Sequence, residues 1–198
     1  KHPQVYKIVD EELPRFGFDG VQHLILNQPE GQVNTGKLMV ALLGKARQKG
    51  VEIFNGIGIE QLRDGNDGVT LETVSGWSIK VPRVLVAVNG FARQLLPGLD
   101  LYPARNQVLL TKPVPGLKVE GCFHYDRGYF YFRNIDGRIL LGGGRNLDLE
   151  TEKTHEFGSN TLIRNALEDL LYKVVCPGQS VEVDTWWTGI LGLGPVKK

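Results

Sequence analysis

The chain has 198 residues, of which 41% are hydrophobic and 23% are charged, and its formal net charge is +1 at pH 7. This is the composition of an ordinary globular protein, with enough apolar side chains for one domain or two small ones. The basic residues are scattered, so the sequence lacks the dense positive footprint of a nucleic-acid-binding surface.

The two cysteines, Cys122 and Cys176, form no C-x-x-C pair and have no spaced histidine ligands beside them. We therefore expect two reduced thiols, with neither a disulfide framework nor a metal site. The N-terminal stretch KHPQVYKIVDEELP lacks the apolar core of a signal peptide, and no run approaches the ~18 apolar residues of a membrane helix. The sequence thus predicts a cytoplasmic protein without a transmembrane segment.

The first elements in chain order are short. Residues 1–33 contain the mixed runs VYKIV and QHLIL, which favour strands or loops near a surface. A helix is predicted over about 35–49, where Leu38, Leu42 and Ala46 recur at intervals of four and a basic last turn precedes a glycine. Ala41 fills the same face of this helix.

Three strand signals come after the helix. The run VEIF at 51–54 predicts one strand, and the alternating stretch 68–82 predicts an antiparallel hairpin around Ser75-Gly76. The run VLVAV at 84–88 is continuously apolar, which is typical of a strand buried on both faces of a parallel or mixed sheet.

Longer strands begin near residue 103: ARNQVLLTKP, then GYFYFRN, then GRILLGG after an Asp-Gly turn. Because strand residues alternate between faces, Tyr129, Tyr131 and Arg133 should share one face of the second strand. Phe130 and Phe132 should share the other, and one of these two sets must form the packed core.

A second helix is predicted over about 159–173, with Ser159 as its cap. Its buried side is expected to hold Leu162, Ala166 and Leu170, with Ile163 and Leu167 as further candidates. The chain closes on an apolar, glycine-rich run. From the residues alone, these elements predict an α/β or α+β domain.

Two glycine-rich stretches invite comparison with phosphate-binding loops. In VEIFNGIGIEQ, Gln61 stands where the third glycine of G-x-G-x-x-G would be, and a turn signal replaces the required helix. In RILLGGGRN, the glycines at 142–144 lead into a polar, unpatterned stretch. Both patterns favour a backbone bend or a close approach to a flat ligand over an autonomous phosphate loop.

Catalytic motifs give no assignment. The sequence contains no G-x-S-x-G, H-E-x-x-H, P-loop or kinase signature, and its four histidines stand in unrelated surroundings. The catalytic residues are therefore unknown from the sequence, and no metal ligands are predicted.

Five segments, taken in order, carry a resemblance to one family. They are GQVNTGKLMVALLGKARQKGVEIFNG, VPRVLVAVNGFARQLLPGL, PARNQVLLTKP, GYFYFRNIDGRILLGGGRN and TWWTGILGLG. They resemble the FAD-dependent oxidoreductases of the D-amino acid oxidase group, which includes glycine oxidase, sarcosine oxidase-like enzymes and bacterial amino-acid dehydrogenases. The matches span about residues 31–194, and their order is more specific than any one of them.

The chain departs from the family pattern in several places. The opening strand, G-x-G-x-x-G and helix are missing, as is the closing segment with further flavin contacts. Asn146 replaces an acid of the family, and the strand ILLGGG has no basic residue before Arg145, which disfavours a sarcosine-type assignment. The resemblance thus implies the middle of such an enzyme, lacking half of the flavin site. The fold it implies is α+β with two layers: a mixed, largely antiparallel substrate-domain sheet packs against helices, and an incomplete FAD-binding α/β portion accompanies it. Its parts would be 1–33 in the substrate region, 34–100 in the FAD-binding region, 101–185 as the substrate-binding sheet and 186–198 as the return to the FAD domain.

The resemblance implies an enzyme that oxidises an amine or amino acid by passing a hydride to FAD, with this fragment alone inactive. A carboxylate-bearing substrate favours planar arginine cations and tyrosine hydroxyls, and the candidate substrate residues are Tyr129, Tyr131, Arg133 and Arg145. A small polar turn after a buried strand is a common ligand-contact point of open sheets, and the candidate FAD residues are Gly56, Ala87, Asn89 and Gly90.

Two other interpretations stay open. The chain could be a non-catalytic α+β module that binds a small molecule or a protein through its aromatic face. A nicotinamide-dependent dehydrogenase is a third hypothesis, but it requires a complete dinucleotide fingerprint, which this sequence does not contain.

Overall fold

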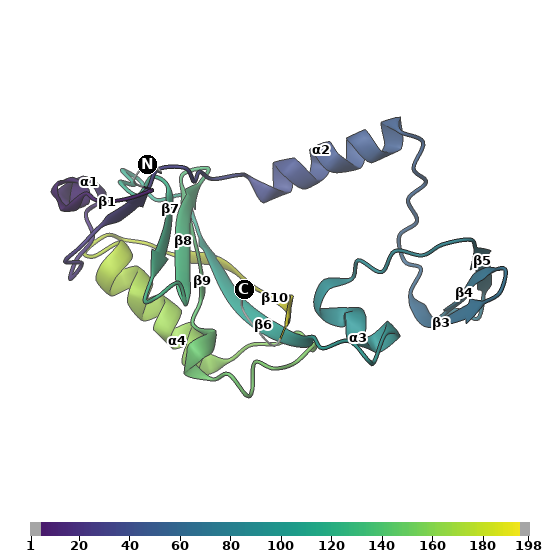
Figure 1. Cartoon of the computed structure of the whole chain (residues 1–198). Coiled ribbons are helices and arrows are strands. Elements are labelled where there is room, and N and C mark those ends of the chain that lie inside the picture. Colours follow the sequence, from purple (N-terminus) through teal and green to yellow (C-terminus); the bar gives the residue numbers. More distant parts are fainter. Residues whose placement is uncertain (1–4, 195–198) are drawn as a thin grey trace. The chain divides into compact units, whose positions relative to one another are not determined.

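The computed structural model describes residues 5–194, which form two compact units (Figure 1). The first, here called the sheet unit, comprises the chain up to residue 34 and residues 105–189. The second, the meander unit, comprises residues 35–104 and the chain from residue 190 onward. The α+β class predicted from the sequence is confirmed, with antiparallel strand pairs and few helices.

The sheet unit is built on five strands in the order β10-β6-β9-β8-β7. Their bounds are β6 Tyr102–Thr111, β7 Cys122–Tyr125, β8 Phe130–Ile135, β9 Arg138–Gly143 and β10 Val183–Leu193. The strands β6, β9, β8 and β7 pair antiparallel in that order. The three long strands predicted from about residue 103 are therefore confirmed as β6, β8 and β9.

The sheet has one packed face, which we call the core face. Strand register places Leu109 of β6, Leu141 of β9 and Phe132 of β8 side by side on it. Phe130 lies on the same face, and all four side chains are buried. Tyr131 and Arg133 point to the opposite face, here called the open face, so the predicted alternation along β8 is confirmed.

Helix α4 (Thr161–Leu170) covers the core face and continues into a π-helical turn, η4 (Leu171–Val175) (Figure 1). Ile163, Leu167 and Leu170 recur at intervals of four and three, so they line one side of the helix and are buried. The predicted helix is confirmed, but two details are wrong. Asn160, not Ser159, caps the helix, and Leu162 is 55% exposed.

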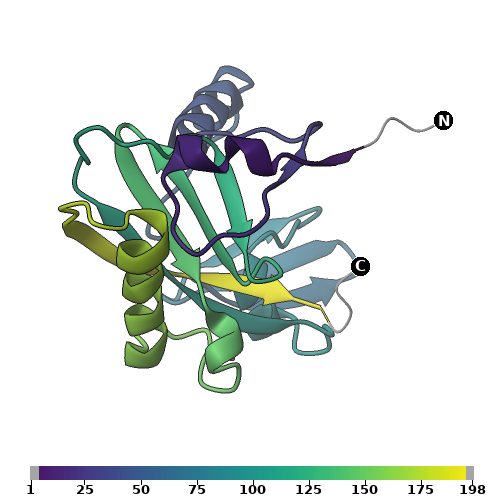
Figure 2. The same ribbon diagram turned by 90° about the vertical axis from the view of Figure 1, so that its left-hand side faces the viewer.

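The N-terminal segment of the sheet unit lies beside strands β7 and β8 (Figure 2) and contacts them through phenylalanine side chains. Strands β1 (Tyr6–Ile8) and β2 (Ile25–Asn27) pair antiparallel and confirm the short strands expected there, with η1 (Asp10–Glu12) and α1 (Leu13–Phe16) between them. The Phe16 ring centroid lies 5.1 Å from that of Phe123, and the Phe18 centroid lies 5.5 Å from that of Phe132. These contacts join the segment to β7 and β8.

The meander unit contains three antiparallel strands, β3 (Ile59–Gly65), β4 (Gly68–Thr73) and β5 (Ser78–Val81), in that order. The predicted hairpin is confirmed as β4 and β5. Helix α2 (Thr35–Gln48) is also confirmed, and the short helices η2 (Asn89–Phe91) and α3 (Ala92–Leu95) come after the meander.

Two strand predictions for the meander unit are wrong. Residues 51–54 and 84–88 are irregular rather than strands, and Leu85 is 90% exposed. The apolar face of α2 is not buried, since Leu38 and Leu42 are 43% and 53% exposed. Helical spacing and apolar runs indicate only which side chains favour burial. A side chain is buried only where another part of the protein packs against it.

Candidate functional site

The three glycines at the end of β9 each serve a different packing need. A Cβ atom at position 142 would lie 2.6 Å from the Tyr131 hydroxyl oxygen, so Gly142 gives room to that ring on the open face. At Gly143, where φ is +111°, a Cβ atom would lie 2.0 Å from the carbonyl oxygen of Tyr129. Gly144 is left-handed and approaches Phe130 and α4 on the core side. The glycines therefore allow protein groups to pack closely around the end of β9, whereas the sequence favoured a backbone bend or a close approach to a flat ligand.

Tyr131 is the best-supported member of the predicted substrate set. Its ring crosses Gly142 on the open face, where the neighbouring strand β7 places His124 directly opposite it. Burial raises the pKa of Tyr131 above its ordinary value, so the hydroxyl is a neutral donor and acceptor at physiological pH. No local sequence signal singles out Gly142 or His124, because their relation to Tyr131 comes from strand register.

Arg133 lies two residues further along the open face, and two of its guanidinium nitrogens already form hydrogen bonds within the protein. Its Nη1 donates to the Val33 carbonyl oxygen at 2.5 Å, and its Nε donates to the Asn134 carbonyl oxygen at 3.3 Å. The Nη2 end of the fork takes part in neither bond. Arg133 therefore holds the segment before α2 in place and can offer a further substrate carboxylate one nitrogen.

The other two substrate candidates lie near the start of β8 rather than beside Arg133. Tyr129 precedes β8, is 44% exposed, and accepts a hydrogen bond from the Gly144 amide through its carbonyl oxygen. Arg145 begins the short helix η3 (Arg145–Leu147) and is half-buried. The structure thus groups Tyr131 with Arg133, and places Tyr129 and Arg145 at the β8–β9 end of the sheet.

The four cofactor candidates all belong to the meander unit. Ala87 and Asn89 are exposed, and Gly56 is an exposed left-handed residue with open space where a Cβ atom would be. These three residues are exposed, and Gly56 has open space beside its backbone, so the residues present fit contact with a flat cofactor. Gly90 is explained by packing instead, since a Cβ atom there would lie 2.6 Å from the Leu191 carbonyl oxygen.

The side chain of Asn89 forms hydrogen bonds to main-chain groups of β10. Its amide nitrogen donates to the Ile190 carbonyl oxygen at 3.2 Å, and its amide oxygen accepts from the Gly192 amide at 2.8 Å. Asn89 adopts a positive φ of 48°, which asparagine tolerates better than most residues. Both polar atoms of its side chain are therefore engaged within the fold, and the predicted FAD contacts remain predictions.

A buried polar network, which the sequence did not reveal, lies on the core face at the end of β6 that pairs with Gly143. The carboxylate of Glu152 is fully buried and accepts from Arg105 Nη2 at 2.8 Å and Nε at 3.1 Å. It also accepts from Gln107 Nε2 at 3.1 Å and Asn160 Nδ2 at 3.2 Å. Burial alone would raise the pKa of Glu152, but these hydrogen bonds outweigh it and leave the pKa below its ordinary value. Glu152 is therefore ionised and ties β6 to the cap of α4.

Metal and membrane sites give negative findings over the described chain. Within residues 5–194, no three His, Cys, Asp or Glu side chains gather as a metal ion would need. Over the same residues, the helices are all too short or too polar to cross a membrane. Cys122 is exposed and Cys176 is buried, and both are free thiols, as expected.

Comparison with known proteins agrees with the resemblance in the sequence. The pattern of the FAD dependent oxidoreductase family, DAO, matches residues 3–196. The chain therefore belongs to this family of FAD-dependent flavoproteins. It is 24% identical over 188 residues to the bifunctional protein ThiO/ThiG of Synechocystis sp., covering 90% of this chain and 28% of that protein.

Solved structures share the fold. L-proline dehydrogenase from P. horikoshii has a TM-score of 0.77 at 16% identity, with 97% of this chain and 54% of that chain covered. Glycine oxidase from Geobacillus kaustophilus also has a TM-score of 0.77, at 19% identity, with 96% and 52% covered. The chain thus spans about half the length of these structures and a smaller share of the curated relative.

Proposed function

We propose that the protein is part of an FAD-dependent oxidoreductase that oxidises an amine or an amino acid in the cytoplasm. The sheet unit would bind the substrate, and the meander unit would contribute to the FAD-binding region. The observation that carries the proposal is the open face of β8, where the neutral Tyr131 hydroxyl, seated over Gly142, lies on the same strand face as Arg133. Family membership supplies the cofactor class.

The residues of the open face suit substrate orientation better than proton abstraction. Tyr131 would donate to or accept from the substrate, and the Nη2 end of Arg133 would bind a carboxylate oxygen. Arg145, at the β8–β9 end of the sheet, is a separate candidate for a carboxylate contact. FAD, when bound, supplies the hydride acceptor. The substrate carbon would lose a hydride while the lone pair of the neutral nitrogen forms a C=N bond, and water would hydrolyse the resulting iminium ion to a carbonyl compound and a released amine or ammonium ion. This reaction needs a neutral amine and fixed geometry more than a dedicated base.

The second candidate is a non-catalytic module that binds a small molecule or a protein. Its support is that Arg133 and Asn89 are both engaged with main-chain groups, so packing alone accounts for these side chains. The two candidates differ in their response to added substrate, since only the oxidoreductase reduces a flavin.

A flavin titration and two substitutions test the proposal. We expect the purified 198-residue chain to retain little FAD through gel filtration, and the full-length gene product to retain it as a yellow protein. In the full-length gene product, Arg133→Leu and Arg145→Leu should each lower kcat/KM for amino acids by about 10- to 100-fold, because a charge-assisted hydrogen bond to the substrate carboxylate is lost. Arg63→Leu, on exposed β3, is the matched control. Unchanged kcat/KM for every amino acid in both variants would refute the carboxylate role.

A further inference from the structure

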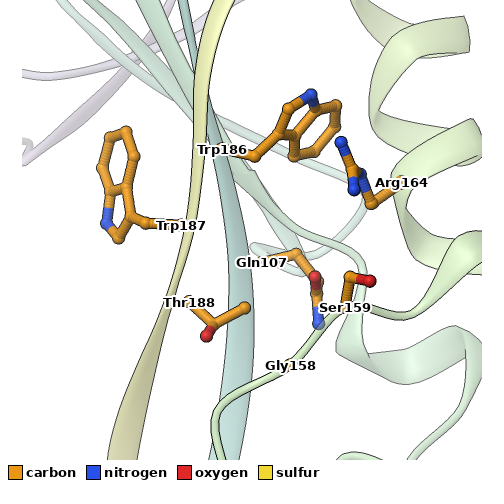
Figure 3. Close-up of a pocket in the computed structure, with 7 residues that line it drawn as sticks. All are labelled: Gln107, Gly158, Ser159, Arg164, Trp186, Trp187 and Thr188. Carbon is orange, nitrogen blue, oxygen red and sulfur yellow. The ribbon is translucent and has the colours of Figure 1, made fainter.

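A hollow of about 320 Å³ lies on the sheet unit beside strand β10 (Figure 3). It is lined from β6 by Gln107, from the segment before α4 by Ser159, and from α4 by Arg164, with Trp186 and Thr188 from β10. None of the predicted substrate residues lines it. The hollow is therefore separate from the substrate site on the open face.

Arg164 is the feature that points to a ligand. Its guanidinium carbon lies 4.2 Å from the centroid of the Trp186 ring, so stacking on the indole fixes the cation in place (Figure 3). Within residues 5–194, no carboxylate forms an ion pair with Arg164. A fixed guanidinium whose charge has no carboxylate partner in the described chain is well suited to receive an anion, because its N–H groups are already oriented.

The surroundings of Arg164 favour negative charge. Ser159 contributes a hydroxyl one residue before the cap of α4, where the positive end of the helix dipole lies. The buried Glu152 carboxylate behind Gln107 is matched by Arg105, so the floor of the hollow carries no uncompensated negative charge. Thr188 adds another hydroxyl and a methyl group.

The walls and size restrict the ligand. Trp186 packs against the hydrophobic core and gives the hollow a flat apolar wall, whereas Trp187 leaves β10 on the other side and is 40% exposed (Figure 3). A volume of about 320 Å³ is at the lower end for small-molecule sites, so the hollow suits a small ligand.

We propose that this hollow binds a small organic carboxylate with a flat apolar body. The carboxylate is held by the Arg164 guanidinium and the Ser159 hydroxyl, and the apolar body lies against Trp186 and Thr188. The site requires no flavin, and this proposal is independent of the oxidoreductase activity proposed above for this protein.

Tryptophan fluorescence of the full chain tests the site directly. Trp77→Phe leaves only Trp186 and Trp187 as indole emitters. Titration of this variant with phenylacetate should give a saturable fluorescence change, and phenylacetamide, which lacks the charge, should bind at least about tenfold more weakly. Adding Arg164→Met should abolish the change for phenylacetate, and Ser159→Ala should weaken it.

Two controls separate this site from the rest of the molecule. Arg133→Met removes the cation of the open face and should leave phenylacetate binding unchanged, so failure of the proposed substrate site and failure of this one are distinguishable. Far-ultraviolet circular dichroism verifies that each variant is folded. The proposal is overturned by a linear, non-saturating titration, by equal affinities for the acid and the amide, or by loss of binding in Arg133→Met rather than in folded Arg164→Met or Ser159→Ala.

Discussion

Replacing Glu152 by alanine should be among the most destabilising single changes in the sheet unit. The substitution leaves the Arg105 guanidinium, which is 9% exposed, without its counter-charge, and it removes the acceptor for Gln107 and Asn160. Breaking a buried ion pair by removing one partner costs about 3–5 kcal/mol. For a chain of this length about 1 kcal/mol lowers the unfolding midpoint by about 2–4 °C, so the midpoint should fall by roughly 6–20 °C.

The assay is thermal and urea unfolding followed by circular dichroism, with Glu150→Ala as the matched control. Glu150 is two positions away and exposed, so its substitution should change stability by no more than about 0.5 kcal/mol. The variants Arg105→Met and Glu152→Leu should each be destabilised as well. The double variant Arg105→Met/Glu152→Leu should lose less unfolding free energy than the sum of these two single losses, because the two side chains interact directly.

The same substitution has a predictable pH dependence. The pKa of Glu152 in the folded protein lies below its ordinary value of 4.5, so ionised Glu152 stabilises the fold at pH values above 4.5. That contribution is lost as the pH falls through the lowered pKa and the carboxylate takes up a proton. The stability difference between wild type and Glu152→Ala should thus be full at neutral pH and shrink in acid. A difference below about 1 kcal/mol at neutral pH would refute the reasoning.

Three further predictions concern single positions. Gly142→Ala should cost about 1–3 kcal/mol in urea unfolding, because its new methyl group would overlap the Tyr131 hydroxyl; an unchanged midpoint would contradict the packing role. Asn160→Asp keeps the cap acceptor of α4 but replaces the amide donor to two carboxylates, so we expect a loss of about 1–3 kcal/mol that diminishes at low pH. Burial raises the pKa of the Cys176 thiol to about 11, so a thiol reagent at neutral pH should label Cys122 alone in the native protein and both cysteines after unfolding; two fast native thiols would contradict this.

The sequence by itself determined the elements whose signals are local. The alternation of Phe130 and Tyr131 along β8, the Asp-Gly turn into β9 and the apolar spacing of α4 are properties of a few neighbouring residues, and the structure confirms each of them. The hairpin of β4 and β5 was predictable for the same reason. Ordered motifs along the chain also sufficed for the family.

Tertiary structure decided the features that depend on residues far apart in the chain. Arg105 and Glu152 are 47 positions apart, and Arg133 and Val33 are 100 positions apart, so their hydrogen bonds leave no local pattern. The exposure of Leu38 and Leu85 contradicts their apolar spacing for a related reason. A periodic pattern reports what a side chain favours, whereas contacts, burial and the available groups of an arginine are set by the surfaces that the fold brings together.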